Sequence, residues 1–249
     1  MTAAGHAAGA EDPDGRTLLE SGLSSLGLKL DPGQVQALLN FAALLRHWGR
    51  TYNLTAIQAP RDIVTHHLLD CLAVVTPMQR ALVGRRGRRL LDVGSGAGLP
   101  GLVLAMADPT VEVVCIDSVG KKTAFVAQAL AHLRIANARV VHGRVEKVEL
   151  GDFDVIVSRA FASLPDFVRS TERLLHPGGV WLAMKGKVPM DEIARMPAAC
   201  TVHVEPLQVP ALDGERCLVR VERRPHLPES ERTPLSHDAS TQDHQFTNR

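Results

Sequence analysis

Apolar residues recur every three or four positions along the first 75 residues, which is the spacing of amphipathic helices. One helix is expected from Thr17 to about Leu28. A second is expected to begin at Asp31 and Pro32, because aspartate caps a helix N-terminus and proline suits its first position. Its apolar stripe is Val35, Leu38, Leu39, Ala42, Leu45 and Trp48. A third helix is expected over residues 61–75. Its stripe is Val64, Leu68, Cys71, Leu72 and Val75.

Beyond this helical part, short apolar runs alternate with helical segments. The runs expected to form strands are residues 90–93, 111–116, 138–142, 153–157, 180–184, 200–210 and 215–222. Helices are expected from Pro100, from Lys121 and over residues 164–175, with a turn over residues 177–179. Strands that are apolar throughout and alternate with helices predict an α/β fold whose sheet is largely parallel.

These patterns divide the chain into four parts. Residues 1–15 and 225–249 are polar or low in large apolar residues, and both are expected to be disordered tails. Residues 16–80 form a helical N-terminal cap, and residues 81–224 form the α/β domain. A cap of this size is too small to be counted on as an independent domain.

Composition narrows the class of protein. The formal net charge of +1 gives no overall attraction to nucleic acid, so any such contact must come from local clusters. The four cysteines form no C-x-x-C pair, and we expect no metal site. No secretory signal begins the chain, and its longest apolar run, residues 93–107, is too short to span a bilayer. We therefore expect a cytoplasmic protein that makes no membrane contact.

Four arginines lie close together before the first predicted strand. Arg85, Arg86, Arg88 and Arg89 fall in or next to residues 77–88, which are expected to form a linker. A solvated loop is the preferred interpretation. The alternative is a patch that contacts phosphate beside the glycine-rich turn that follows.

The most informative stretch runs from Leu90 to Gly101, where a strand leads into alternating glycines. Such a turn lets the backbone approach a ligand closely. Gly96-x-Gly98-x-x-Gly101 matches the dinucleotide fingerprint, which holds a pyrophosphate. Asp92-x-Gly94-x-Gly96-x-Gly98 matches the turn of S-adenosylmethionine (AdoMet) methyltransferases, where a carboxylate suits the ammonium group of the ligand. Alone, the two patterns leave both ligands open, and also a turn that binds nothing.

Three further positions carry candidate chemistry. Asp117 ends a strand about twenty residues after the glycines, where a carboxylate meets ribose hydroxyls in nucleotide-binding folds. Arg159 follows the strand at 153–157, at the end where ligands bind in open α/β sheets, although a surface ion pair is the alternative. His67 and Asp70 are neighbours on one helix face. An ordinary hydrogen bond and a functional pair both remain open for them.

Taken together, these pieces resemble the bacterial small-subunit ribosomal RNA guanine-N7 methyltransferases, also called glucose-inhibited division protein B. The matching segments, in order, are residues 52–55, 67–70, 91–101, 117–122, 144–146, 158–163, 184–186 and 210–216. Each segment alone is weak, but their order and spacing are specific. The resemblance implies a class I AdoMet-dependent methyltransferase fold, Rossmann-like, with a seven-stranded sheet and a helical cap.

The resemblance also implies site residues. Those expected at AdoMet are Asp92, Gly94, Gly96, Gly98, Leu99, Asp117, Val145, Glu146 and Arg159. Those expected on the substrate side are Asn53, His67, Asp70, Arg144, Arg159, Lys185 and Arg216. The substrate would be 16S ribosomal RNA or the small ribosomal subunit. We expect the protein to act as a monomer, although nothing in the residues fixes an oligomeric state.

The reaction can be narrowed further. Residues 158–161, Ser-Arg-Ala-Phe, lack the Asn/Asp-Pro-Pro-aromatic motif of enzymes that methylate exocyclic amines, and they hold no catalytic cysteine. Guanine N7 carries a lone pair and needs no base, so catalysis would rest on positioning. Asp70 could stabilise the cationic product, directly or through His67. The alternatives are a nicotinamide-dependent oxidoreductase, a non-catalytic ribosome-binding factor, and AdoMet chemistry on another RNA.

Overall fold

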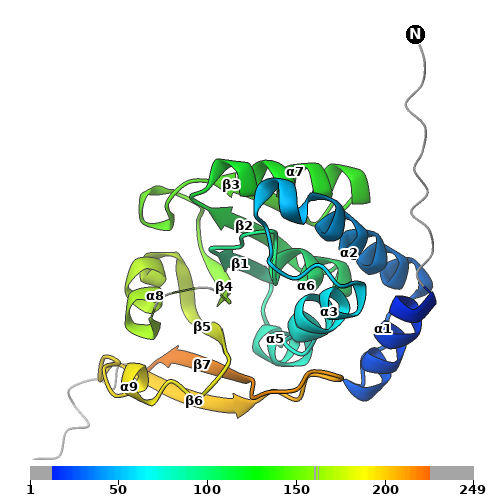
Figure 1. The fold of residues 1–249 in the computed structure, drawn as a ribbon. Helices are drawn as coiled ribbons and strands as arrows, with labels where there is room; N and C mark the ends of the chain where they lie inside the picture. The colour runs from blue at the N-terminus through cyan, green and yellow to red at the C-terminus, as the bar shows by residue number, and fades with distance from the viewer. Residues whose placement is uncertain (1–12, 160, 162, 225–249) are drawn as a thin grey trace, which may run out of the picture.

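The computed structural model of the chain describes residues 13–159, 161 and 163–224. Within this part, seven strands form one sheet in the order β3-β2-β1-β4-β5-β7-β6 (Figure 1). The strands are β1 Arg89–Val93, β2 Glu112–Asp117, β3 Ala138–His142, β4 Phe153–Ser158, β5 Leu175–Lys185, β6 Cys200–Pro206 and β7 Cys217–Arg223. All pairs are parallel except those made by β7. The predicted α/β class with a seven-stranded sheet is confirmed.

The topology of the sheet shows at which edge the parallel strands end. The parallel strands β1 to β5 all end at one edge, called here the carboxyl edge. Strand β7 runs the other way, so its first residue, Cys217, pairs with Lys185 at the end of β5. The connections run to opposite sides of the boundary between β1 and β4, which is the switch point at which such sheets bind ligands.

Alternating residues of the strands enter two separate apolar cores. Leu90 and Val113 belong to the core on one face of the sheet, whereas their neighbours Leu91 and Val114 belong to the core on the other face. Because successive side chains of a strand point to opposite faces, a continuous apolar run is needed when both faces are covered. This is why the central strands β1, β2 and β4 read as largely apolar.

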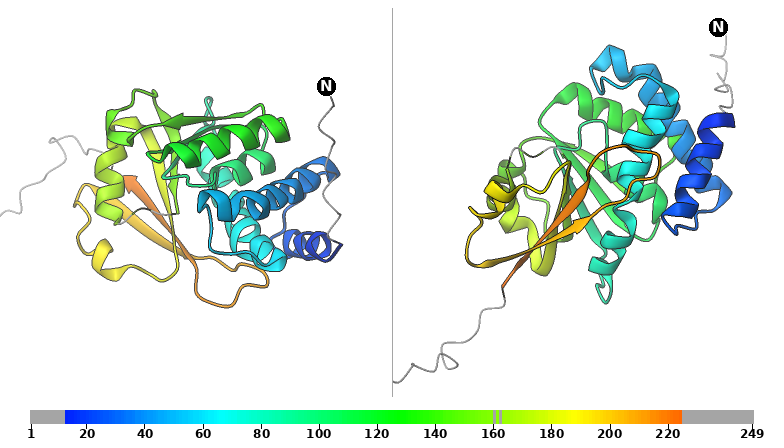
Figure 2. Two further views of the ribbon diagram at one scale, coloured as in Figure 1. Left: turned by 45° about the horizontal axis from the view of Figure 1, so that its top comes forward. Right: turned by 60° about the horizontal axis from the view of Figure 1, so that its bottom comes forward.

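Helices cover both faces (Figure 2). The first face is covered by α1 Pro13–Ser25, α2 Pro32–Tyr52, α3 Pro60–Ile63, the π-helix η1 Val64–Leu69, α4 Asp70–Leu72, α5 Val75–Leu82, α6 Gly101–Ala107 and α7 Gly120–Leu133. The second face is covered by the 3₁₀-turn η2 Val145–Lys147, α8 Leu164–Thr171, the 3₁₀-turn η3 Glu172–Leu174 and α9 Met190–Ile193. In the described part of the chain, no helix is long and apolar enough to cross a membrane.

The N-terminal helices pack directly on the sheet. Residues of α1 and α2, such as Leu19 and Phe41, share one buried apolar cluster with Leu218 of β7. The predicted N-cap of α2 is confirmed, because Asp31 Oδ1 accepts the N–H of Gln34 at 2.9 Å. The Gln34 side chain in turn donates to the carbonyl of Met106, which ties α2 to the end of α6. The boundary of the cap at residue 80 stays a prediction.

Both ends of α1 differ from the prediction. The helix begins at Pro13, so residues 13–15 are helical although they were expected in the tail; the rest of both tails lies outside the described residues. The helix ends before Gly27, whose φ of +67° closes it, and the N–H of Leu28 returns to Leu23 O at 2.9 Å.

Other elements also differ from the prediction: helix α9 was not predicted, and β6 ends at Pro206, before the predicted residue 210. Helix α5 occupies much of the expected linker at 77–88, and Pro77 fits because it lies in the first turn, where its missing N–H removes no helical bond. Strand β5 begins at Leu175, before the predicted turn at 177–179. The turn is accommodated within the strand by a register shift against β4.

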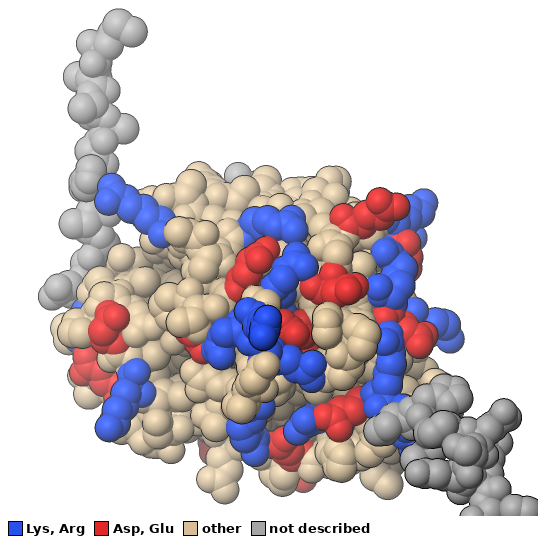
Figure 3. Space-filling view, turned by 180° about the vertical axis from the view of Figure 1, so that it is seen from behind, with Lys and Arg blue, Asp and Glu red and all other residues tan. Residues whose placement is uncertain are grey.

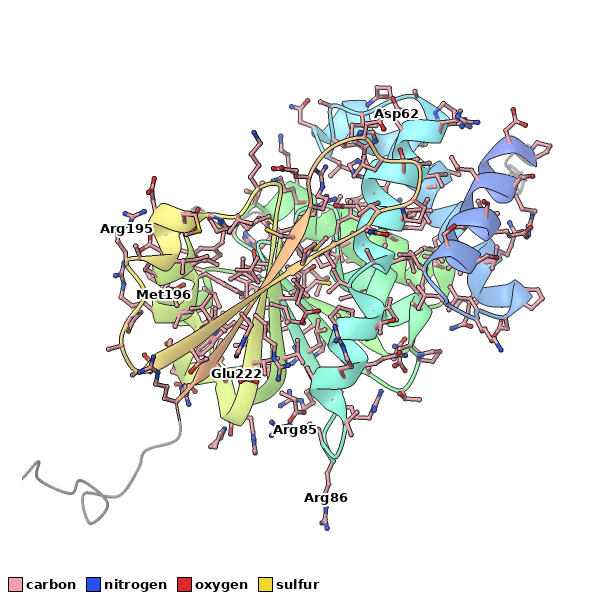
Figure 4. The ribbon with its side chains drawn as sticks, turned by 90° about the horizontal axis from the view of Figure 1, so that it is seen from below. Asp62, Arg85, Arg86, Arg195, Met196 and Glu222 are labelled. Carbon is pink, nitrogen blue, oxygen red and sulfur yellow. The ribbon has the colours of Figure 1, made fainter. Side chains whose placement is uncertain are left out.

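Three of the four clustered arginines, Arg85, Arg88 and Arg89, make structural contacts. Arg85 donates to the carbonyl of Pro177, Arg88 forms an ion pair with Asp108 at 3.1 Å, and Arg89 donates to the carbonyl of Asp152. Figure 4 shows Arg85 and Arg86 at one end of the molecule and Asp62 at the other. Arg89 begins β1, whereas the glycine turn follows its last residue, so the alternative of a phosphate patch beside that turn is wrong.

Close packing under the glycine turn gives the first prediction. A Cβ on Gly101 would lie 2.6 Å from Cys115 Sγ and 2.8 Å from Asp92 Oδ2. Gly101→Ala is therefore expected to lower the free energy of unfolding, measured in urea, by about 1–3 kcal/mol. Gly186→Ala is the matched control, because a Cβ there meets nothing within 4 Å. Equal stability of the two variants would contradict this packing.

Candidate active site

The turn after β1 is wound by glycines. Gly94, Gly96 and Gly98 have φ values of +68°, +56° and +84°, in the left-handed region that favours glycine. The amides of Gly94 and Ser95 donate to Ile116 O at 2.9 and 3.1 Å, which fixes the turn to the end of β2. A Cβ on Gly94 would meet no atom within 4 Å, so a ligand can approach the backbone closely there.

Asp92 is a fully buried carboxyl group with an unused acceptor. Its Oδ2 accepts the N–H of Gly101 at 2.7 Å, whereas Oδ1 has no hydrogen-bond partner. Burial raises the pKa of Asp92 to about 7, although the Gly101 N–H and the charge of Arg159 act in the opposite direction. A buried unpaired acceptor is unfavourable unless a ligand supplies a donor.

Asp117 forms the next part of the site at the end of β2. Its Oδ2 accepts the N–H of Gly96 at 2.9 Å and its Oδ1 that of Val119 at 2.8 Å, so the carboxylate is fixed in orientation. The carbonyl of Asp117 accepts the N–H of Gly143 at 3.0 Å. This bond brings the segment after β3 alongside, with Val145 buried and Glu146 exposed.

These groups fit AdoMet. Asp92 offers an acceptor for the ammonium group, the turn at Gly94 allows close approach, and Asp117 presents ordered oxygens for ribose hydroxyls. Gly98 and Leu99 close the turn, because both amides donate to Ser95 O at 2.8 and 2.9 Å. The individual contacts of these residues with AdoMet stay predictions.

A buried carboxylate organises the other half of the site. Asp70, whose side chain is 6% exposed, accepts from Arg216 Nε at 3.0 Å and from Arg159 Nη1 at 3.4 Å. Arg159 follows β4 and Arg216 precedes β7, so this carboxylate joins the helical layer to two strand ends. We call Asp70, Arg159 and Arg216 the Asp70 cluster.

His67 is a neutral and fully hydrogen-bonded side chain. Burial and then the charge of Arg159 lower the pKa of His67 to about 4. Its Nδ1 lies 3.1 Å from the carbonyl of His66, which can only accept, so Nδ1 carries the proton. Its Nε2 then accepts from the hydroxyl of Thr55 at 2.8 Å. Of the two interpretations left open for His67 and Asp70, a hydrogen bond between them is therefore wrong, since Asp70 is held by arginines instead.

The helix that carries these residues changes locally to a π-helix. The amide of Asp70 donates to Thr65 O, five residues back, and to His67 O, rather than to His66 O, the α-helical acceptor. His66 O accepts instead from Arg159 Nη1 at 3.2 Å. The irregular turn thus provides a backbone acceptor that helps to orient Arg159.

The Asp70 cluster lines a cleft of about 340 Å³ at the carboxyl edge. Five residues predicted on the substrate side line it, namely His67, Asp70, Arg159, Lys185 and Arg216. The other two residues predicted on the substrate side are exposed: Asn53 is the C-cap of α2, and Arg144 precedes η2. Within the part of the chain that the structure describes, neither lines the cleft. Also within the described part of the chain, no three His, Cys, Asp or Glu side chains are placed to hold a metal ion.

Three residues that shape the site were not predicted. Thr55 fixes the His67 ring and lies in a matching segment, residues 52–55, so that motif was a signal for it. His66 acts through its carbonyl, which no residue pattern indicates. Glu192 of α9 holds Lys185, with Oε2 and Oε1 at 2.9 and 3.2 Å from Nζ. No motif marks Glu192.

Comparison with known proteins decides the family. Residues 34–219 match the family described as GidB, rRNA small subunit methyltransferase G. The Ribosomal RNA small subunit methyltransferase G of Methylibium petroleiphilum is 51% identical over 207 residues, which cover 83% of this chain and 93% of that protein. The protein of the same name from Bordetella avium is 48% identical over 214 residues, covering 86% and 96%. The chain belongs to the GidB family.

A solved structure supports the fold alone. TrmN from Thermus thermophilus superposes with a TM-score of 0.50 at 18% identity, covering 65% of this chain and 53% of that one. Membership of the GidB family confirms the resemblance drawn from the motifs and the AdoMet-dependent class. The nicotinamide-dependent alternative is therefore wrong, and the glycine turn is that of an AdoMet enzyme.

The pKa of Asp92 gives a stability prediction for this GidB family member without ligand. Burial raises the pKa of Asp92 from its ordinary value of 3.8 to about 7 in the folded state. The folded state therefore binds the proton more tightly than the unfolded state and loses stability as pH rises through this interval. Asp92→Asn keeps an acceptor for Gly101 and is expected to stabilise the protein by up to about 4 kcal/mol above pH 7, with a smaller gain at pH 5.

Urea unfolding at pH 5 and pH 8 measures this difference. Asp152→Asn, at an exposed position, is the control and should change stability little at either pH. A gain for Asp92→Asn that does not grow with pH would contradict the raised pKa.

Proposed function

We propose that this protein transfers a methyl group from AdoMet to N7 of a guanine in 16S ribosomal RNA. We propose further that it acts as a monomer in the cytoplasm. The observation that carries the proposal is the match to the GidB family over residues 34–219, together with the glycine turn and the unpaired Asp92 oxygen at the switch point of the sheet. AdoMet supplies the methyl group when bound.

Guanine N7 fits the chemistry of the cleft. Its lone pair is the nucleophile, so the protein needs to remove no proton and His67 can stay neutral. What the cleft offers is a set of fixed cations, Arg159, Lys185 and Arg216, that can hold phosphates and orient the base. The Asp70 carboxylate lies among them and reduces the positive charge that the guanine meets as it becomes cationic.

The charge distribution agrees with local rather than global attraction to RNA. On the face shown in Figure 3, basic and acidic side chains are interspersed. With a net charge of +1, long-range attraction is weak, and binding must come from the few cations at the carboxyl edge. Because N7 is hard to reach in the deep groove of A-form RNA, the target guanine is expected in an open or loop structure.

Transfer of labelled methyl groups tests the function. Small ribosomal subunits from cells that lack this gene are incubated with the protein and labelled AdoMet, and the product is digested to nucleosides. Label in 7-methylguanosine is the expected result. Label in another nucleoside would overturn the guanine-N7 assignment, and AdoMet binding without transfer to any RNA would favour a non-catalytic ribosome-binding factor.

Arg159→Ala is expected to reduce methyl transfer about 100-fold or more. This guanidinium lies between the two halves of the site, and small misplacements of reacting groups can cost this much. Arg216 still pairs with Asp70, so the fold should persist in urea unfolding. Arg169→Ala, at an exposed ion pair of α8, is the control. Near-normal turnover of Arg159→Ala would remove Arg159 from the site.

The rate at saturating AdoMet and RNA is expected to be flat between pH 6 and pH 8, because the ammonium group of bound AdoMet would keep Asp92 ionised in this interval. The pKa of His67 is about 4, so this ring stays neutral throughout the interval and takes no proton from the substrate. A general base with a pKa near 7 would instead lower the rate about tenfold for each pH unit below that value. A mechanism based on positioning would be contradicted if the rate shows this slope with pH while the affinity for AdoMet does not.

A further inference from the structure

We propose that Glu192 is a built-in competitor for RNA phosphate at Lys185, and thereby determines which RNAs the site accepts. The inference rests on the proposed function, since it takes RNA as the substrate. It concerns a residue of α9 that lies outside every motif of the chain, and a cation that lines the cleft.

The geometry places Lys185 between the cleft and Glu192. Lys185 ends β5, lines the cleft and has a side chain that is 16% exposed. Both carboxylate oxygens of Glu192 lie within hydrogen-bond distance of its ammonium group, at 2.9 and 3.2 Å. Glu192 is itself fixed, because its Oε2 accepts the N–H of Leu164 at 2.7 Å in the first turn of α8. The pair is thus ordered and only slightly exposed.

The Lys185–Glu192 pair differs in net charge from the Asp70 cluster. Asp70 is one carboxylate shared by two arginines, so the Asp70 cluster keeps a net positive charge. Lys185 and Glu192 are paired one to one, and their charges cancel. A phosphate that enters the cleft therefore meets a free charge at the arginines, but reaches Lys185 only by displacing a carboxylate.

Displacement discriminates between RNAs. An RNA that makes only phosphate contacts loses affinity, because it must break the Lys185–Glu192 pair and then faces the released carboxylate. A target whose other contacts seat its guanine in the cleft can offset that loss. Glu192 thus acts against RNAs that lack the right structure. Without Glu192, Lys185 would be free to bind any exposed phosphate.

Glu192→Gln tests the proposal with little disturbance of structure. The amide oxygen still accepts the N–H of Leu164, while the negative charge at Lys185 is removed. Asp191→Asn is the matched control, because it changes the net charge equally, lies one residue away in α9 and is exposed. Thermal melting checks that both variants fold.

The probe is a single-stranded RNA oligonucleotide whose sequence is unrelated to 16S RNA. Its dissociation constant is measured by fluorescence anisotropy with AdoMet present, between about 50 and 200 mM salt. Glu192→Gln is expected to bind this RNA about threefold to tenfold more tightly. The slope of log affinity against log salt concentration should be steeper by about 0.7, because Lys185 becomes free to neutralise one more phosphate, which releases one more counterion from the RNA. Asp191→Asn should leave the slope unchanged.

A second substitution assigns the gain to Lys185. In the double variant Glu192→Gln with Lys185→Gln, affinity and salt slope should return toward the wild-type values, since the freed cation is gone. A gain that persists without Lys185 would overturn the proposal. Equal affinities and salt slopes of Glu192→Gln and Asp191→Asn would also overturn the proposal, provided that the wild-type protein methylates small subunits. A wild-type protein that transfers no methyl group to any RNA would overturn the proposed function itself, and this inference with it.

Discussion

The buried carboxylate of Asp70 is the constraint on which the rest of the site depends. A charge with its side chain only 6% exposed is unfavourable unless it is paired, and its partners come from two distant strand ends. Arg159 and Arg216 can both reach it only when the N-terminal helices pack on the sheet and β7 pairs with β5 in the observed register. The apolar core that the N-terminal helices share with the sheet therefore also holds this carboxylate within reach of both arginines. It also couples correct folding to the assembly of the cleft.

The site is divided by the sign of its charges. Carboxylates gather at the ends of β1 and β2, where Asp92 and Asp117 face the glycine turn. Cations gather at the ends of β4 and β5 and at the start of β7. The acidic half suits a sulfonium amino acid, and the basic half suits a polyanion. Arg159 lies near the boundary. Burial raises the pKa of Asp92 and the charge of Arg159 opposes this shift, whereas burial and then Arg159 both lower the pKa of His67.

Sequence reasoning succeeded where local chemistry and topology agree. Asp92, Asp117 and Arg159 could be placed because residues that end parallel strands meet at one edge, and alternating glycines mark the turn between them. It failed where tertiary contacts decide the structure. Residues 77–82 of helix α5 were interpreted as part of a linker because the arginine-rich residues 85–89 that follow them resemble a solvated loop. The π-helix η1 has no signature in the spacing, so the partners of His67 and Asp70 could not be assigned.

The same limits explain why the pairing of the cations escaped prediction. Lys185 and Arg216 belong to recognisable motifs, but a motif does not say which carboxylate faces each cation in the folded state. In the folded protein Asp70 faces Arg216 and Glu192 faces Lys185, and each carboxylate comes from a different element than its cation. A cleft whose three cations face two carboxylates keeps only part of its positive charge free and still holds its donors in fixed positions. Because attack by guanine N7 needs orientation and no proton transfer, ordered and partly neutralised cations are better suited to it than a strongly basic surface, which would bind phosphates without aligning the base.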